Sequence, residues 1–317
     1  PAPLATGLVC ATGTLGQIIP PSIALVLLGD VLSNAYHQAQ IQNGVFNPES
    51  ISVGDLFAGA LLPGLLLVTL YIGYLLIRIF LLEKSGKMPK VLPQTTHTNW
   101  QLGLSLLAPI GLILLVLGSI LFGIATPTEA AGIGALGALL LTTIKRQMSL
   151  QQLSQSLQQT AQVSAMVFMI LIGAALFSLV FRGFGGDELV QSAFAHLPGG
   201  AFSAMLVVML LVFLLGFILD FIEITFVVVP IVGPILLAMG IDPIWLGIML
   251  AVNLQTSFLT PPFGFALFYL RGVAPTTIST QTMYKGVLPF IAIQVLLLVI
   301  LSVFPQLATW LPSVIFG

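Results

Sequence analysis

A pair of adjacent prolines inside a long apolar run constrains this chain more than any other feature. Hydropathy alone predicts one membrane-spanning helix over residues 248–270, yet this run contains Pro261 and Pro262. Because proline lacks a backbone N–H and its ring clashes with the preceding turn, a continuous helix through the pair is not expected. Broken backbone inside a bilayer must line a cavity or be buried in protein, since lipid offers it no hydrogen-bond partner. The run therefore predicts a broken helix at a polar site.

The residues around this break are polar but uncharged, which suits a dehydrated cation and a polar substrate. We expect residues 253–262 to be non-helical and to line such a site. The candidate lining residues are Asn253, Gln255, Thr256, Ser257, Thr260, Pro261, Pro262 and Gly264.

A similar pattern near the start of the chain indicates an internal repeat. Both copies open with Pro-x-x-x-Gly, at residues 3–7 and 243–247, and both reach Pro-Pro after an apolar half-helix, with one insertion between them. Paired interrupted helices point to the binding site of a repeat-built secondary transporter, although two unrelated proline kinks stay an alternative. We expect residues 13–21 to be non-helical and the two breaks to meet at mid-membrane. The lining candidates of this copy are Thr12, Gly13, Thr14, Gly16, Pro20, Pro21 and Ser22.

Composition places the chain among helical membrane proteins. It is 58% hydrophobic and 6% charged, with a mean hydropathy of +1.12, whereas a soluble domain would carry about a quarter charged residues. The net charge of −1 argues against a nucleic-acid partner, and the single Cys10 excludes an internal disulfide. Motifs of membrane metalloproteases, serine hydrolases and P-loop ATPases are absent from the sequence, so we do not expect an enzyme.

Apolar runs and turns divide the chain into consecutive parts. These are a first broken helix (1–32); an outer loop, spanning helix and basic cytoplasmic loop (33–100); spanning helices with an amphipathic surface helix near 150–157 (101–200); a re-entrant hairpin and second broken helix (201–275); and a connector with the last spanning helix (276–317).

The distribution of Lys and Arg predicts the orientation. All of them except Arg182 fall in segments that the positive-inside rule places on the cytoplasmic side. The first broken helix then runs outward and the second inward, so the repeat is inverted. The predicted fold is an all-α polytopic inverted-repeat transporter with two broken helices and a re-entrant hairpin. The cytoplasmic basic positions lie at 78–90, 145–146, 271 and 285.

Residues 202–240 are too few for two complete spans with a turn, and their interruption holds Gly216, Asp220 and Glu223. Carboxylates inside a membrane mark an ion or substrate path, although either acid could instead cap a helix near a wet tip. Since hard cations prefer oxygen ligands, the candidate sodium ligands are Asp220, Thr256 and Thr260.

Residues 126–129 form a predicted capping box, with Thr126 at the N-cap, proline at the first helical position and Glu129 at the third. The glycines that follow, Gly132, Gly134 and Gly137, allow another helix to pack closely.

Several of these motifs together resemble the DctM family, the large membrane subunit of TRAP transporters. The similar stretches cover residues 13–22, 126–131, 182–188, 215–220 and 253–264. The resemblance extends over essentially the whole chain, but it lacks the family's N-terminal part, including the first re-entrant hairpin.

This resemblance implies a tripartite system in the bacterial inner membrane, surrounded by lipid. The partners would be a small DctQ-like membrane subunit and a periplasmic substrate-binding protein. Transport would be sodium-coupled, elevator-like import of small organic acids. The two breaks would line the cation and substrate sites, with Asp220 as the hairpin carboxylate. Alternatives are a stand-alone secondary transporter of the same architecture and an inactive truncated fragment or assembly scaffold.

Overall fold

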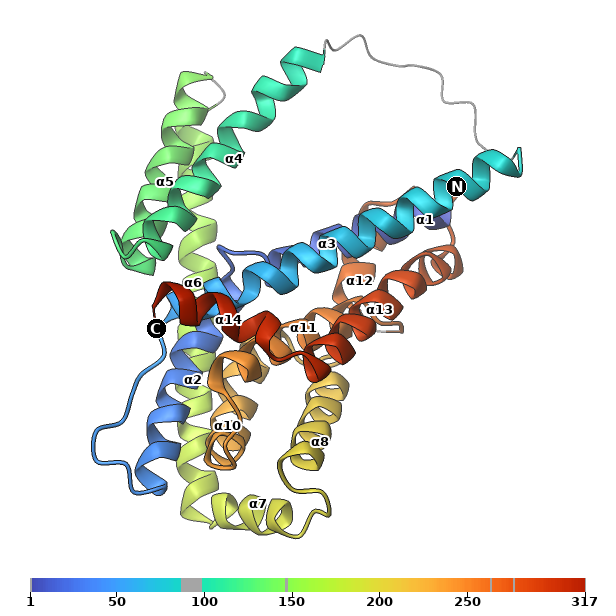
Figure 1. Cartoon of the computed structure of the whole chain (residues 1–317). Coiled ribbons are helices and arrows are strands. Elements are labelled where there is room, and N and C mark those ends of the chain that lie inside the picture. Colours follow the sequence, from blue (N-terminus) through green and yellow to red (C-terminus); the bar gives the residue numbers. More distant parts are fainter. Residues whose placement is uncertain (1, 87–98, 146–147, 263, 276, 317) are drawn as a thin grey trace. The chain divides into compact units, whose positions relative to one another are not determined.

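The computed structural model describes residues 2–86, 99–145, 148–262, 264–275 and 277–316 (Figure 1). Helices joined by turns make up this described part of the chain, and no strand occurs in it. The predicted all-α class is therefore confirmed. Contacts divide the chain into two compact units, one formed by Pro1–Met88 with Ile170–Gly317 and the other by Pro89–Met169.

The larger unit holds both proline pairs. Its helices, in chain order, are α1 (Ala2–Thr14), the 3₁₀ turn η1 (Leu15–Gln17), α2 (Ile23–Gln42), α3 (Val53–Lys84), the last turns of α6 (Leu150–Gly183), α7 (Gly186–Ala195), α8 (Gly200–Leu215), α9 (Phe221–Glu223), the π-helical η2 (Ile224–Val228), α10 (Val229–Ala238), α11 (Pro243–Leu259), α12 (Phe265–Val273), α13 (Thr280–Val303) and α14 (Gln306–Ile315).

The smaller unit contains α4 (Asn99–Leu121), α5 (Pro127–Ile144) and the first turns of α6. The predicted capping box begins α5. Gly134 and Gly137 face Val116 and Leu112 of α4, where added Cβ atoms would lie 3.2 Å and 2.3 Å from these side chains. Two of the three glycines thus allow the predicted close packing, whereas Gly132 has open space around it.

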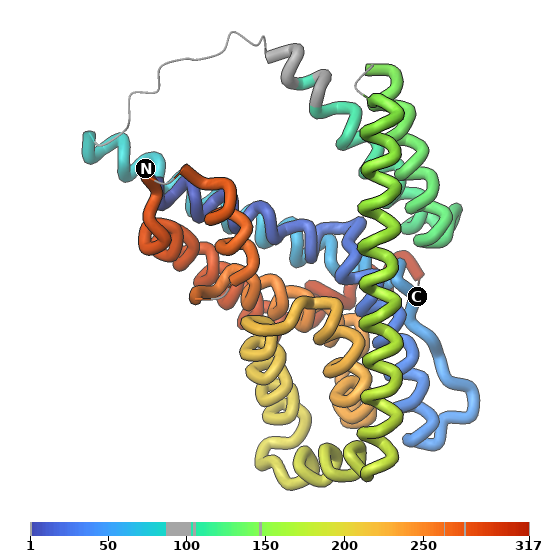
Figure 2. The backbone as a smooth tube through the Cα atoms, turned by 180° about the vertical axis from the view of Figure 1, so that it is seen from behind, coloured from blue at the N-terminus to red at the C-terminus, as the bar shows by residue number. Residues whose placement is uncertain are grey.

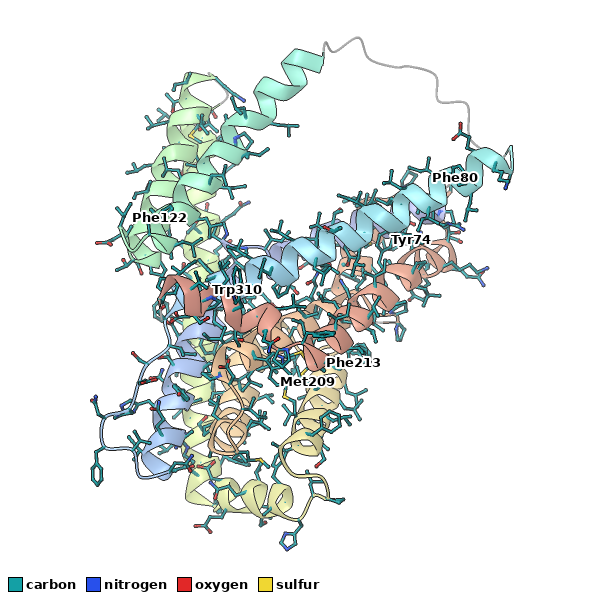
Figure 3. All side chains as sticks on the ribbon, in the orientation of Figure 1. Tyr74, Phe80, Phe122, Met209, Phe213 and Trp310 are labelled. Carbon is teal, nitrogen blue, oxygen red and sulfur yellow. The ribbon has the colours of Figure 1, made fainter. Side chains whose placement is uncertain are left out.

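Within the described residues, 5 helical stretches are long and apolar enough to cross a membrane: Val53–Lys84, Pro127–Ile144, Leu150–Gly183, Phe221–Ala238 and Thr280–Val303. Many of their apolar side chains lie on the outside of the fold, among them Phe80, which points away from the bundle (Figure 3). Exposed apolar surface on such helices is what a bilayer covers. The chain is a multi-pass membrane protein.

Both proline pairs interrupt helices as predicted. Residues 15–22 separate α1 from α2, and residues 260–264 separate α11 from α12. In each copy the first half-helix contacts the second half-helix of the other copy, so α1 packs on α12 and α2 packs on α11 (Figure 2). The two broken helices therefore lie side by side and run in opposite directions.

The predicted extent of the breaks was wrong. Residues 253–259 are helical in α11, and Gly13 and Thr14 belong to α1. The polar side chains are compatible with helix because their hydroxyls bond back to its carbonyls, as Thr256 Oγ1 does to Val252 O at 2.7 Å. Proline disturbs only the turn that precedes it, so the interruption is short.

Residues 200–238 form a helical hairpin. The chain ascends through α8, reverses at residues 216–220 and returns through α9, η2 and α10, with α8 and α10 in contact (Figure 2). One arm packs on each broken helix, α8 on α11 and α10 on α2. The reversal brings Asp220 to the tip of the hairpin.

Three other elements differ from the expectation. Helix α2 continues to Gln42 into the predicted outer loop, and the predicted surface helix at 150–157 is continuous with the next span in one helix of 34 residues. Nothing separates them because residues 150–172 contain neither glycine nor proline. The last predicted span is divided into α13 and α14 at Phe304 and Pro305.

Candidate functional site

The helices that lead into the two breaks, α1 and α11, are joined by a buried hydrogen bond. Gln255 of α11 is fully buried, and its Nε2 donates to Thr14 Oγ1 of α1 at 3.4 Å. Helix α11 also contacts η1, the turn that follows Thr14. The first break therefore lies against α11, the helix that leads into the second break, while the meeting of the two breaks at mid-membrane stays a prediction.

Two amide oxygens at this meeting point have no hydrogen-bond partner among the described residues. These are Gln255 Oε1 and Gln17 Oε1, both buried. Buried polar atoms in folded proteins are almost always paired, so these two oxygens are free to accept a hydrogen bond from water or to bind an ion. The meeting point therefore offers oxygen atoms that can accept a ligand.

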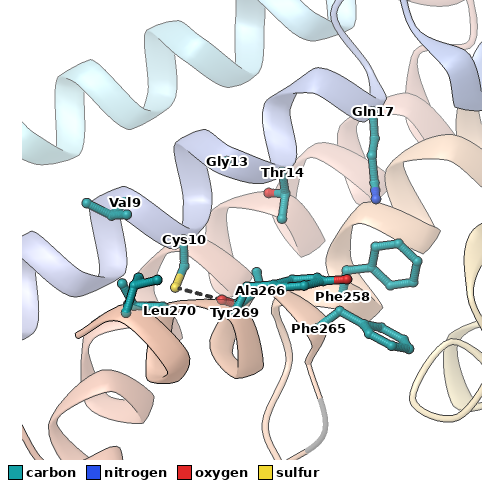
Figure 4. Close-up of a pocket in the computed structure, with 11 residues that line it drawn as sticks. Val9, Cys10, Gly13, Thr14, Gln17, Phe258, Phe265, Ala266, Tyr269 and Leu270 are labelled. Carbon is teal, nitrogen blue, oxygen red and sulfur yellow. Dashed lines mark hydrogen bonds between the residues drawn. The ribbon is translucent and has the colours of Figure 1, made fainter. Parts of the chain in front are cut away.

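A groove with a cavity volume of about 500 Å³ lies along α1 and α12, and Thr14 and Gln17 are among its lining residues (Figure 4). Its walls are mainly apolar, and Thr14, Gln17 and the hydroxyl of Tyr269 supply polar groups. Cys10 Sγ lies 3.6 Å from Ala266 O and links the two walls. The lining residues are Val9, Cys10, Gly13, Thr14, Gln17, Phe258, Phe265, Ala266, Tyr269, Leu270 and Val273.

Sequence reasoning missed the aromatic wall of this groove. In the sequence, Phe258, Phe265 and Tyr269 are simply part of an apolar run. The spacing of 265 and 269, one helical turn apart, places them on one face of α12, but the sequence does not tell which helix that face meets.

The hydroxyls of the predicted lining residues donate to their own helices. Thr14 bonds to Ala11 O at 2.9 Å, Ser257 to Leu254 O at 2.8 Å and Thr260 to Thr256 O at 2.7 Å. Each oxygen keeps lone pairs that can accept. Thr12, which bonds to Leu8 O at 2.8 Å, is exposed and lies outside the groove lining.

The turns at the two breaks are built differently. Ser22 caps α2 by accepting from Leu25 N at 3.4 Å, and its hydroxyl donates to Gln17 O at 2.6 Å. The Pro20–Pro21 and Pro261–Pro262 peptide bonds are both cis. Gly264 lies so close to the preceding turn that a Cβ there would be 2.7 Å from Phe258 O. Gly16, by contrast, has no atom near its Cβ position.

Asn253 points to the hairpin rather than to the groove. Its Nδ2 donates to Met209 O of α8 at 2.8 Å. Residues two apart in a helix lie on nearly opposite sides, so Asn253 and Gln255 serve different neighbours.

Asp220 lies at the hairpin tip in a capping arrangement with Glu223. Asp220 Oδ1 accepts from Phe221 N at 2.7 Å, and Glu223 Oε2 accepts from Asp220 N at 3.2 Å. These bonds match the cap alternative, while no hydrogen bond joins Asp220 to Thr256 or Thr260. Among the residues that the structure describes, no group of three or more His, Cys, Asp or Glu could hold a metal. The sodium-ligand assignment stays a prediction.

The relatives that comparison with known proteins gives are TRAP transporter permease proteins. The sialic acid TRAP transporter large permease protein SiaM of Vibrio cholerae is 30% identical over 99% of this chain and 68% of its own length. The C4-dicarboxylate TRAP transporter large permease protein DctM of Pseudomonas aeruginosa is also 30% identical, over 99% and 68%. The isethionate TRAP transporter permease protein DctMQ of Oleidesulfovibrio alaskensis is 30% identical over 95% of this chain and 44% of its own.

The family model described as "Tripartite ATP-independent periplasmic transporter, DctM component" matches residues 1–307. The chain belongs to the DctM family of TRAP transporter large permease subunits.

Proposed function

We propose that this chain is the large permease subunit of a sodium-coupled, binding-protein-dependent importer of small organic acids in the bacterial inner membrane. The observation that carries the proposal is the meeting of two antiparallel broken helices at the Gln255–Thr14 hydrogen bond, beside unpaired amide oxygens. Paired interrupted helices at one point are typical of the binding sites of inverted-repeat transporters. The reciprocal packing of the half-helices supports the inverted repeat.

Sodium suits the atoms available there. Hard cations take oxygen ligands, and the meeting point supplies the amide oxygens of Gln17 and Gln255 and the hydroxyl of Thr14. Thr256 and Thr260 keep acceptor lone pairs, and Asp220 contributes a carboxylate at the hairpin tip. An elevator-like movement would carry such a site across the membrane.

The N-termini of the second half-helices favour an anionic substrate. Both second halves, α2 and α12, begin at the breaks, so their positive dipole ends lie at the meeting region. The relatives named above are named for sialic acid, C4-dicarboxylates and isethionate, all of which carry an acidic group. Small organic acids are therefore the proposed substrate class.

The proposed partners are a small DctQ-like membrane subunit and a periplasmic substrate-binding protein, within a lipid bilayer. The relative named DctMQ combines both subunit letters in one name. The proposed outer surface carries the carboxylates Glu49 and Asp242 near Tyr36. The pKa of Tyr36 is raised above its ordinary value mainly by burial, and the charges of these two carboxylates raise it further. A binding protein with basic residues would fit such a surface.

The test is reconstitution in liposomes of this chain with a small membrane subunit and a binding protein, supplied with labelled sialic acid, C4-dicarboxylates or isethionate. We expect uptake only with an inward sodium gradient and both partners. Asp220→Asn should abolish it, because the part-buried carboxylate proposed to bind the cation loses its charge. The matched control is Glu129→Gln, which keeps an amide acceptor at the cap of α5 and should retain uptake.

Other outcomes would separate the alternatives. Uptake without either partner would support a stand-alone transporter, and no uptake by the complete complex would support an inactive fragment. Equal sodium-dependent uptake by the unchanged chain and the Asp220→Asn variant, at matched protein amounts, would refute the ligand role of Asp220.

A further inference from the structure

We propose that Asn253 is a positioning residue, not a ligand, and that together with Gly216 it fixes the hairpin on α11 and so places the tip that carries Asp220. The effect of this positioning on transport rests on the proposed function, whereas the packing of the hairpin on α11 does not. The sequence predicts that Asn253 and Ser257 line the site, whereas in the structure both contact the hairpin.

The first contact is a hydrogen bond between two otherwise apolar helix faces. Asn253 is 3% exposed, and its Nδ2 lies 2.8 Å from Met209 O. Residues 204–215 of α8 are all apolar, so they offer only backbone atoms to a polar partner. Among the hydrogen bonds of the described residues, this is the one side-chain bond that joins α8 to another helix.

The second contact is a close approach that only glycine allows. Gly216 ends α8, and a Cβ at this position would lie 2.2 Å from Ser257 Oγ and 2.8 Å from Ser257 Cβ. Ser257 is four residues after Asn253, which places both on one face of α11. Two contacts on one face hold α8 in both position and rotation.

The position of the hairpin tip follows from these contacts. Residues 217–220 leave α8 directly after Gly216, and Leu219 N still bonds to Leu215 O at 2.8 Å. Asp220 is therefore only four residues from the fixed glycine. A substitution in the α8–α11 contact would therefore move the Asp220 carboxylate although the substituted residue does not contact it.

Gln255 is the natural comparison residue. It is buried on α11 two residues after Asn253, yet it bonds to Thr14 of α1 and has no bond to the hairpin. The two amides thus have similar chemistry and burial but different neighbours. Loss of the Asn253 amide should loosen the hairpin tip, whereas loss of the Gln255 amide should not.

The experiment is amide hydrogen exchange on the full chain, with any partner subunits, in lipid nanodiscs. Asn253→Leu should speed exchange at residues 209–220 roughly tenfold, because one lost hydrogen bond shifts a local opening equilibrium by about that factor. Gln255→Leu should leave exchange there unchanged. Unaltered exchange in Asn253→Leu would overturn the proposal, whether or not the chain transports.

A second pair of variants covers the case in which Asn253→Leu does not fold. Gly216→Ala should speed exchange at the tip, and adding Ser257→Gly should restore slow exchange by removing the atoms that the new Cβ meets. Uptake by the complete complex should recover with it. If slow exchange returns but uptake does not, Ser257 itself acts on the transported solute. If neither slow exchange nor uptake returns in the double variant, the proposed contact between Gly216 and Ser257 is refuted.

Discussion

At the scale of single residues, two glycines decide how closely α1 and α13 approach. A Cβ on Gly7 would lie 2.0 Å from Gly286 O, and a Cβ on Gly286 would lie 2.1 Å from Pro3 O. Both obstacles are backbone atoms, which cannot move aside as the end of a flexible side chain can. This close approach of the two helices therefore holds α1, which carries Thr14, against the spanning helix α13.

We expect Gly7→Ala to destabilise the protein by about 1–3 kcal/mol, the usual cost of overpacking a close contact. The measurement is the thermal unfolding temperature of the purified protein in detergent. Gly13→Ala is the matched control, because Gly13 lies in the same helix and has no atom within 4 Å of a new Cβ. Equal unfolding temperatures for the two variants would contradict the close approach of α1 and α13 at Gly7.

At the scale of elements, α5 shows a helix whose start is set by its own sequence. Thr126 Oγ1 accepts from Glu129 N at 3.3 Å, and Glu129 Oε2 accepts from Thr126 N at 2.8 Å. Both bonds satisfy backbone N–H groups at the start of the helix, where the first N–H groups have no partner within the helix. Proline at the first turn needs no such partner.

Thr126→Ala should destabilise the start of α5 by about 1 kcal/mol, because it removes the N-cap acceptor. Hydrogen exchange of the amides at residues 128–130 should accelerate. Thr143→Ala serves as the control, since Thr143 bonds to Leu139 O near the other end of the helix. Unchanged exchange in the first turn would show that tertiary packing, rather than the cap, holds this helix end.

At the scale of the whole molecule, the end of the first broken helix lies beside the end of the hairpin. Asn43, which follows α2, donates from Nδ2 to Ala238 O of α10 at 3.3 Å. Four residues later Asp242 caps α11 by accepting from Trp245 N at 2.8 Å. The first broken helix thus ends near where the second begins, as an inverted arrangement requires.

Cysteine labelling in spheroplasts tests the orientation, in a chain whose buried Cys10 is first replaced by Ser. We expect Asn43→Cys to react with an impermeant maleimide in intact spheroplasts and Lys84→Cys to react only after lysis. Both positions are exposed, so access to them is limited by the membrane alone. The reverse pattern would mean that the predicted outer face is cytoplasmic.

The helix-breaking prolines, the hairpin reversal and the cap of α5 could be predicted because each depends on neighbouring residues. Proline removes a donor and clashes with its own preceding turn, wherever the helix is placed. Hydropathy likewise acts residue by residue, so the membrane class followed from composition. The length of the breaks was overestimated because Thr256 and Ser257 can bond to their own helix, a choice that local polarity does not reveal.

Sequence by itself thus determined that the chain is helical, spans a membrane and breaks twice at proline pairs, because these properties arise from local sterics and the transfer of side chains from water to lipid. Only the tertiary structure decided that Asn253 faces α8, that Gln255 faces Thr14 and that Phe265 and Tyr269 line a groove with α1. Which neighbour a helix face meets depends on packing between segments more than 200 residues apart, as Thr14 and Gln255 are. That packing is set by close approaches such as Gly7 to Gly286, which no local pattern contains.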